Sequence, residues 1–302
     1  MTIRIGTASW TDPSLIKCKR FYPKGCSSAE QRLRYYASQF SLVEVDSTYY
    51  SMPRADFAQA WADRTPADFR FNVKAFRILT GHQTPPAQLP ADVRQMLEPI
   101  QAKNVYYKDL TPEIRDMLWR RYLGGIEPLR VAGKLMAVHF QFAPWFTHGS
   151  ANMDYLREVR ERLNDYTVSI EFRSKGWLFE AHRESTLELL RQNRLVHTIT
   201  DEPQGFPNSV EQVWEVTNPE LSVLRLHGRN VETWAAKDAK TAADRFNYDY
   251  SDIELAGLAE HARRIVPRVR DLSIVFNNNN EDQGQRNART LRSILEGKVE
   301  QS

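Results

Sequence analysis

Eight short β-type runs recur along the 302-residue chain, and helical patterns lie between them. The runs cover residues 3–8, 42–47, 69–75, 135–142, 167–172, 196–200, 222–228 and 272–277. Strands that alternate with helices predict a parallel sheet, and eight strand–helix units predict a closed (β/α)₈ barrel of the TIM type. The alternative is a doubly wound open sheet, but helices cover both faces of such a sheet and its strands are more continuously apolar.

Apolar residues recur at helical spacing in four of the segments between these runs. The patterns lie at 29–40, 153–163, 255–265 and 288–295, and Ser150 and Ser251 stand where N-caps are expected. Two connections are long. Residues 76–134 contain the stretch TPPAQLP and two expected helices, around 91–103 and 111–123, and residues 229–250 form the second connection. We interpret both as elaborated loops, so residues 1–302 are expected to form a single barrel domain.

The overall charge of the chain excludes few classes of function by itself. The chain has 41 Lys and Arg residues against 38 Asp and Glu residues, a formal net charge of +3. This excess is too small to predict nucleic-acid binding, although a local basic cleft stays open. No apolar run approaches the roughly 20 residues of a membrane helix, and MTIRIGTASW lacks the layout of a signal peptide, so a cytoplasmic protein without membrane association is expected. Cys18 and Cys26 are interpreted as free thiols, with no role assigned.

The predicted strands carry polar residues on one face. In VEVDSTYY (43–50), Val43 and Val45 alternate with Glu44 and Asp46. One strand face of a barrel packs on the helices and the other points inward, so we assign the apolar positions outward and the polar positions inward. The inward set is Glu44, Asp46, Asn72, Lys74, His139, Gln141, Ser169, Glu171, Arg225 and His227. It gathers toward the C-terminal strand ends, where barrel active sites are built.

Positive donors near the strand ends favour an anionic ligand. They are Lys74, Arg173, Arg225, His227 and Arg229. Asn277–Asn280 precede the last expected helix, and exposed N–H groups at a helix start favour anions. Loops after strands seven and eight commonly hold phosphate in barrels. A small anionic or phosphorylated substrate is therefore expected. The alternative is an arginine network that only compensates Glu44, Asp46 and Glu171.

Two carboxylates are candidates for acid–base work. Glu44 and Glu171 come from strands two and five, across the barrel from each other, and either can act as a general acid or base. We assign catalysis to Glu44, Lys74, Glu171 and Arg173, in a reaction of the hydrolase or lyase/isomerase type. The chain has no G-x-S-x-G, P-loop or G-x-G-x-x-G motif, so no nucleotide cofactor is expected.

Two other function classes stay open. Glu171, Asp201 and His227 are candidate ligands for a divalent metal, and with a metal the barrel would suit a phosphodiesterase or endonuclease acting on nucleic acid. A metal-free site is preferred because the chain has no H-E-x-x-H and no closely spaced histidine pair. The third class is a non-catalytic binder of a ligand or a partner protein. The oligomeric state is left open.

Six sequence blocks, in order, resemble the YecE-like family, also known as domain of unknown function seventy-two. They are GTASW, RLRYYASQFSLVEVDSTYYSMP, FRFNVKAFRILT, IEFRSKGW, LRLHGRN and VFNNNNEDQGQRNA. The resemblance implies a TIM-type barrel but no established reaction. It marks as site-like Trp10, Glu44, Ser47, Thr48, Tyr50, Lys74, Gln141, Glu171, Arg173, Trp177, His227, Gly228, Arg229 and Asn277.

The substrate-binding set combines these positions with one departure from the family pattern. Asp46 stands where the family usually has Asn, which adds a negative charge at the mouth. His139 and the PWF after Phe142 also depart from the usual pattern, so a shifted ligand preference is expected. The binding set is Trp10, Asp46, Thr48, Tyr50, Gln141, Trp177, His227, Arg229 and Asn277. Aromatic residues that follow the strand ends are expected to stack on a ring or to cover the barrel, and they are Trp10, Tyr49, Tyr50, Trp145, Trp177 and Trp234.

Overall fold

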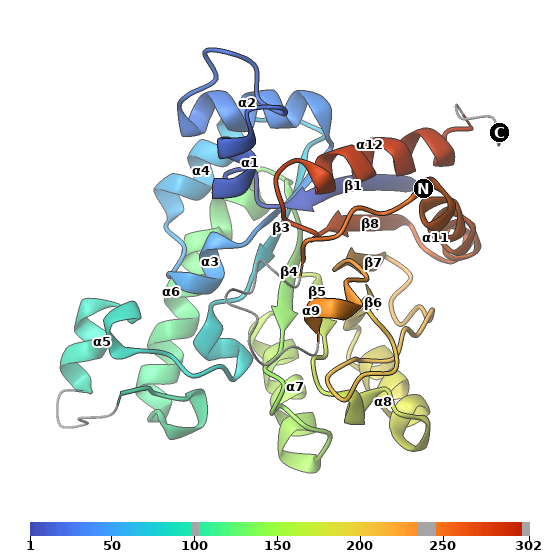
Figure 1. Ribbon diagram of the computed structural model, residues 1–302. Helices are drawn as coiled ribbons and strands as arrows, with labels where there is room; N and C mark the ends of the chain where they lie inside the picture. Colours follow the sequence, from blue (N-terminus) through green and yellow to red (C-terminus); the bar gives the residue numbers. More distant parts are fainter. Residues whose placement is uncertain (98–102, 235–245, 298–302) are drawn as a thin grey trace.

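All eight predicted strands pair in chain order, and β8 returns to β1, so the sheet closes into a parallel barrel (Figure 1). The computed structural model describes residues 1–97, 103–234 and 246–297. The strands are β1 (Thr2–Ala8), β2 (Leu42–Val45), β3 (Arg70–Lys74), β4 (Leu135–Gln141), β5 (Val168–Glu171), β6 (Val196–Asp201), β7 (Leu221–Leu226) and β8 (Asp271–Phe276). The predicted TIM-type barrel is confirmed.

Helices follow every strand except β6. They are α1 (Pro13–Cys18), α2 (Ala29–Gln39), α3 (Ser47–Tyr50), α4 (Ala55–Asp63), α5 (Ala91–Met96), α6 (Pro112–Val131), α7 (Ser150–Arg162), α8 (Glu180–Gln192), α9 (Val231–Trp234), α11 (Asp252–Ile265) and α12 (Gln283–Leu295). Ser251 caps α11 as predicted, whereas the cap of α7 is Gly149 rather than Ser150. Within the described ranges, no helix is both long and apolar enough to cross a membrane.

The prediction of a helix after every strand is wrong between β6 and β7. Residues 202–220 make this connection through turns and irregular backbone. The segment contains Pro203, Pro207 and Pro219, and proline in a helix interior removes a hydrogen bond and clashes with the preceding turn. Val210 and Val213 are nevertheless buried, so the irregular segment itself covers this side of the barrel.

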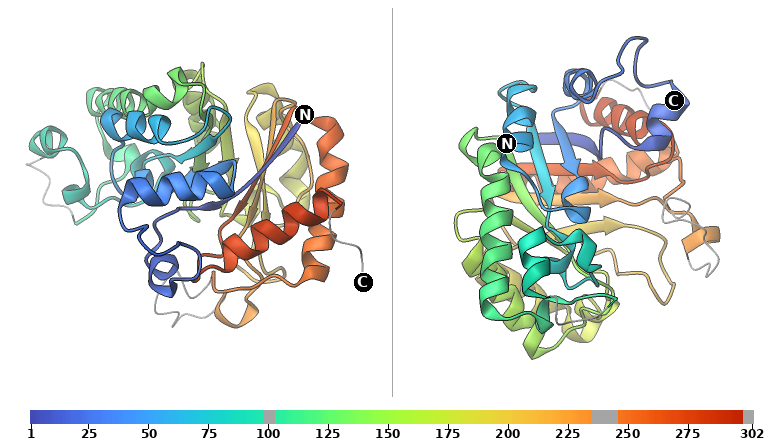
Figure 2. Two further views of the ribbon diagram at one scale, coloured as in Figure 1. Left: turned by 90° about the horizontal axis from the view of Figure 1, so that it is seen from above. Right: turned by 90° about the vertical axis from the view of Figure 1, so that its left-hand side faces the viewer.

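The long connection after β3 contains both expected helices, with different ends. α5 ends at Met96, and the rest of the predicted 91–103 helix falls partly on residues 98–102, which lie outside the described residues. α6 continues past residue 123 to Val131, through a Gly pair and Pro128. A Cβ at Gly125 would lie 2.3 Å from the Pro53 carbonyl oxygen, so glycine allows α6 to pack closely at this point. α5 projects from the barrel side (Figures 1 and 2).

The strand faces divide as predicted. The outward residues belong to one hydrophobic core with the helices, and they include Val43, Val45, Phe71, Val73, Val138, Phe140, Val168, Ile170, Leu224 and Leu226. Small apolar clusters fill the interior nearer the strand starts, where Leu42 packs with Val275, and Ala137 packs with Val223. Polar side chains occupy the interior toward the strand ends. Asn72 of β3 donates to Ser273 of β8 across the barrel (2.9 Å). Apolar and polar side chains therefore fill the barrel interior together, with the polar ones toward the C-terminal ends of the strands.

Lys134 supports the barrel from the start of β4. Its Nζ donates to the carbonyls of Ala62 (2.5 Å) and Thr65 (2.6 Å), at the end of α4. Lys134→Met keeps the aliphatic stem but leaves these carbonyls without their donor. We expect the free energy of unfolding to fall by about 1–3 kcal/mol. Urea denaturation measures this loss against Lys17→Met, which changes an exposed lysine in α1. Equal losses in the two variants would contradict the assigned role.

Candidate functional site

Arg225 of β7 lies at the centre of the polar interior and pairs with two carboxylates. Its Nε and Nη2 donate to the two oxygens of Glu44 (3.0 and 2.6 Å), and its Nη1 donates to Glu171 Oε2 (2.5 Å). All three side chains are fully buried. The two glutamates do face each other across the barrel, as predicted, but they share one arginine. The compensating network that the sequence left open is therefore present for these two carboxylates.

The ion pairs determine the charge states of the two glutamates. Burial opposes ionisation of Glu44, but Arg225, with His139 and Lys74, lowers its pKa to about 2. Burial likewise opposes ionisation of Glu171, yet Arg225 and His227 hold its pKa well below the usual range. Both groups are thus ionised near neutral pH, and Arg225 occupies oxygens of each. The geometry fits structural carboxylates better than the acid–base role we expected for Glu44 and Glu171.

His227 is held in one tautomer beside Glu171. The Asn277 amide donates to its Nδ1 (2.9 Å), so Nε2 carries the proton and donates to Glu171 Oε1 (3.1 Å). Burial lowers the pKa of His227 against the opposing effect of Glu171, which favours the neutral ring. Gln141 Nε2 also donates to Glu171 Oε1 (2.7 Å). His227 and Gln141 therefore both donate to Glu171 Oε1, and Asn277 orients the His227 ring.

Asp46 and Lys74 form a further ion pair at this end of the barrel, and both side chains are partly exposed. Lys74 Nζ lies 3.2 Å from Asp46 Oδ1, and the two side chains are 12% and 23% exposed. Asp46 Oδ1 accepts no hydrogen bond from the described residues. Burial raises the pKa of Asp46, and the charge of Glu44 adds to this increase against the opposing effect of Lys74. Asp46 is therefore held less firmly than Glu44 or Glu171.

Arg173 follows β5 and is engaged by two acids. It pairs closely with Glu202, and its Nη1 lies 3.7 Å from Glu171 Oε1. Its guanidinium also lies over the ring of Trp234, 5.4 Å from the ring centroid. Glu202 was missed in the sequence because it lies two positions beyond the predicted strand at 196–200. Its position next to Asp201, at the end of a strand, could have marked Glu202 as a site residue.

Asp201 and Arg229 belong to a separate cluster. Arg229 Nη2 and Nε donate to Asp201 (2.7 and 3.0 Å), and Tyr250 and Gln212 donate to the same carboxylate (2.7 and 2.9 Å). The chain reverses here through Gly228, whose φ of +87° suits glycine. The predicted anion donor Arg229 is thus paired with an acid. The contact of Tyr250 with Asp201 could not be predicted from the sequence, because the two residues lie 49 positions apart.

The proposed metal ligands are not assembled. Glu171 and His227 contact each other, but the Asp201 carboxylate is occupied by Arg229 and Tyr250. Among residues 1–97, 103–234 and 246–297, no group of three or more His, Cys, Asp or Glu side chains could hold a metal ion. The candidate ligands Glu171, Asp201 and His227 therefore do not form one group in this arrangement of the chain.

The remaining predicted binding residues differ in position. Trp177 is fully buried and donates to the Phe146 carbonyl (2.7 Å), so it supports the barrel and offers no stacking face. Thr48 is buried and donates to the Lys74 carbonyl (2.7 Å), which fixes the end of β3. Trp10 is buried edge-on against Trp61. Tyr50, in contrast, is 60% exposed.

Comparison with known proteins gives one family. A family model described as "Protein of unknown function DUF72" matches residues 4–302. The UPF0759 protein YunF of Bacillus subtilis is 29% identical over 296 residues, covering 97% of this chain and 95% of that protein. The UPF0759 protein YecE of Escherichia coli is 32% identical over 81 residues, or 27% of this chain and 26% of YecE.

Solved structures agree with the sequence relatives. A DUF72 family protein from Enterococcus faecalis superposes with a TM-score of 0.80 at 27% identity, covering 100% of this chain and 97% of that one. A DUF72 family protein from Thermotoga maritima gives a TM-score of 0.75 at 27% identity, covering 98% of this chain and 100% of that one. None of these names assigns a reaction or a substrate.

Proposed function

This chain belongs to the DUF72 family of proteins of unknown function, and from its own residues we propose that it is an enzyme that performs acid–base chemistry on a small anionic substrate. In this proposal the reaction takes place at the barrel mouth, above the buried Arg225 cluster. Asp46 is the general acid and base, and Lys74 holds the anion. Glu44 and Glu171 position these groups and carry the fixed negative charge beneath them.

The observation that carries the proposal is the contrast between Glu44 and Asp46. These carboxyls lie two residues apart, Glu44 in β2 and Asp46 just past its end, yet Arg225 lowers the pKa of Glu44 to about 2 while burial raises the pKa of Asp46. A pair of titratable groups whose surroundings push their pKa values apart is typical of acid–base sites. Asp46 is also the partly exposed member, which a substrate can reach.

The charge balance at the barrel mouth sets a condition for binding a small anion. Arg225, Lys74 and Arg173 face Glu44, Glu171, Glu202 and Asp46, so the site carries one excess negative charge when Asp46 is ionised. It is neutral when Asp46 is protonated, and Lys74 then loses its only ion-pair partner among the described residues. An anion is therefore expected to bind Lys74 with Asp46 protonated, which places a proton donor beside the substrate.

The test begins with a thermal-shift screen of the purified chain against phosphorylated and carboxylated metabolites, followed by mass spectrometry of any ligand for conversion. We expect a stabilising anion whose affinity falls as the pH rises through the pKa of Asp46. Lys74→Met should weaken binding about 10- to 150-fold, as loss of one charge-assisted contact of about 1.5–3 kcal/mol implies. The control Lys17→Met should leave binding unchanged.

Asp46→Asn separates catalysis from binding. The amide keeps the shape of the side chain and mimics its uncharged form, so anion binding should persist and lose its pH dependence. Turnover should fall about 10²–10⁴-fold, the usual contribution of a general acid or base. Conversion that survives Asp46→Asn would contradict the assigned role. Binding without conversion at any pH would favour the non-catalytic binder instead.

A further inference from the structure

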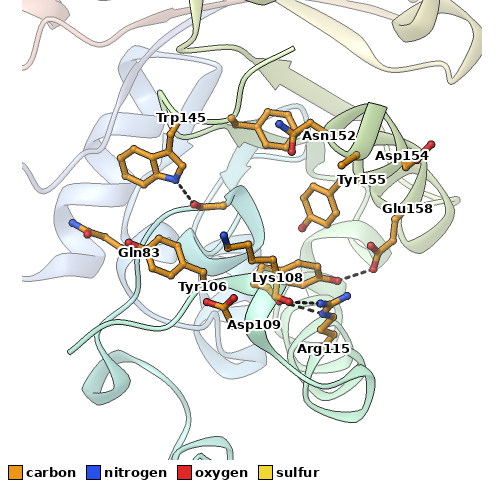
Figure 3. Close-up of a pocket in the computed structure, with 14 residues that line it drawn as sticks. Gln83, Tyr106, Lys108, Asp109, Arg115, Trp145, Asn152, Asp154, Tyr155 and Glu158 are labelled. Carbon is orange, nitrogen blue, oxygen red and sulfur yellow. Dashed lines mark hydrogen bonds between the residues drawn. The ribbon is translucent and has the colours of Figure 1, made fainter. Parts of the chain in front are cut away.

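A cavity of about 900 Å³ lies beside the barrel mouth, between the segment that follows β3 and the start of α7 (Figure 3). Its walls come from residues 81–83, 106–115 and 145–158, in the segments that follow β3 and β4. This volume falls within the range of about 300–1,000 Å³ that is typical of small-molecule sites. No member of the predicted substrate-binding set lines it.

Hydrogen bonds between the two walls hold the cavity open without a ligand. Tyr155 of α7 donates to the Leu79 carbonyl (2.6 Å), and Trp145 Nε1 donates to the Gly81 carbonyl (2.9 Å). Tyr107 donates to Glu158 (2.6 Å) across the same gap. Each bond joins the segment after β3 to the segment after β4. The cavity is therefore preformed, which limits the entropy lost on binding.

Aromatic rings make up much of the lining. Tyr106, Tyr107, Phe146 and Tyr155 contribute, and Trp145 leaves 53% of its surface exposed at the cavity. A large, exposed indole that is fixed by its own Nε1 hydrogen bond presents a rigid face for stacking. Figure 3 shows Trp145 and Tyr106 on one side of the cavity and Tyr155 on the other. The lining therefore suits a flat ring.

Two cations in the wall have no carboxylate partner within the described residues. Arg115 donates Nε and Nη2 to the carbonyls of Tyr107 (3.2 Å) and Lys108 (2.8 Å), which leaves Nη1 available. The Lys108 side chain extends toward the rings in Figure 3. Two of the wall acids, in contrast, are already paired: Asp154 with Arg157 and Glu158 with Arg162. Lys108 and Arg115 against Asp109 leave one net positive charge.

We propose that this cavity binds a small planar aromatic anion. Its ring stacks on Trp145, and its phosphate, sulfonate or carboxylate group lies near Lys108 and Arg115. The site is separate from the Asp46–Lys74 pair. A row of ring contacts lies between them, from Trp145 to His82 (5.8 Å) and from His82 to Tyr49 (5.3 Å). The proposal therefore stands whether or not the barrel mouth is catalytic.

Calorimetric titration of the full chain tests the proposal with three aromatic anions: adenosine monophosphate, phenyl phosphate and naphthalene-1-sulfonate. We expect at least one to bind, and to bind more tightly than inorganic phosphate or the corresponding uncharged ring. Trp145→Ala should raise its Kd about tenfold, because stacking on an aromatic side chain contributes about 1–3 kcal/mol. Lys108→Met should raise the Kd about fivefold or more through loss of an ionic contact.

The controls separate this cavity from the mouth and from general surface binding. Phe57→Ala removes an aromatic side chain of similar exposure (52%) on α4 and should leave the Kd unchanged. Failure of all three anions to bind would overturn the proposal. So would binding that Trp145→Ala leaves intact, and loss of binding in Lys74→Met alone would assign the ligand to the barrel mouth instead.

Discussion

Replacing Arg225 with methionine is expected to lower the free energy of unfolding by about 3–5 kcal/mol, the usual cost of removing one partner from a buried ion pair. The reason is geometric. Arg225 donates three hydrogen bonds to Glu44 and Glu171, and both carboxylates are fully buried. Methionine approximates the stem but supplies no donor and no charge. Urea denaturation followed by tryptophan fluorescence measures the loss.

The matched control is Arg34→Met. Arg34 pairs with Glu30 one helical turn away in α2, and both side chains are well exposed, so the loss should be about 0.5 kcal/mol or less. Adding Glu44→Gln and Glu171→Gln to Arg225→Met should recover part of the stability, since the unpaired charges are then removed. A similar loss in Arg225→Met and Arg34→Met would refute the view that Arg225 supports the barrel centre.

Acid is expected to destabilise the protein strongly, with Glu44 and Glu171 as major contributors. Both have folded-state pKa values below the ordinary glutamate value of 4.5, with that of Glu44 at about 2. The unfolded chain therefore takes up protons at these positions before the folded protein does. The stabilisation is fully present above about pH 4.5, and it is lost as the pH falls toward about 2.

Urea denaturation at several pH values between 5 and 2 isolates this effect by comparison with Glu44→Gln. The variant will be less stable near neutral pH, but it cannot take up a proton at residue 44. Its stability should therefore change less steeply with pH than that of the native chain. Asp56→Asn is the control, because Asp56 lies on the surface in an exposed ion pair. Parallel curves for the native chain and Glu44→Gln would count against a depressed pKa at Glu44.

The alternation of residues in the strands was enough to predict the barrel and its inward face. The side-chain period of a strand is two, so the apolar Val43 and Val45 determine where Glu44 and Asp46 must point. The same logic placed Arg225 opposite Leu224 and Leu226. Polar residues inside a parallel sheet distinguish a barrel from an open sheet covered by helices. Fold and inward face thus follow from local pattern.

The pairing of those inward residues could not be predicted. Register determines which carboxylate meets which base, and Arg225 lies 181 residues from Glu44 and 54 from Glu171. The sequence therefore supplied a list of charges without the partners that neutralise Arg173, Arg225 and Arg229. The cavity at Trp145 was also missed as a site. Its walls bring α7 and the start of α6 together with segments that have no periodicity, and the contacts between them are tertiary.

The Arg225 cluster also bears on how the chain can be divided. Glu44 belongs to the first half of the barrel, whereas Arg225 and Glu171 belong to the second. In a first half folded alone, Glu44 would have no counter-ion, and in a second half alone, Arg225 would have one partner missing. Autonomous half-barrels, and assembly by joining prefolded halves, are therefore disfavoured relative to concerted closure of the ring.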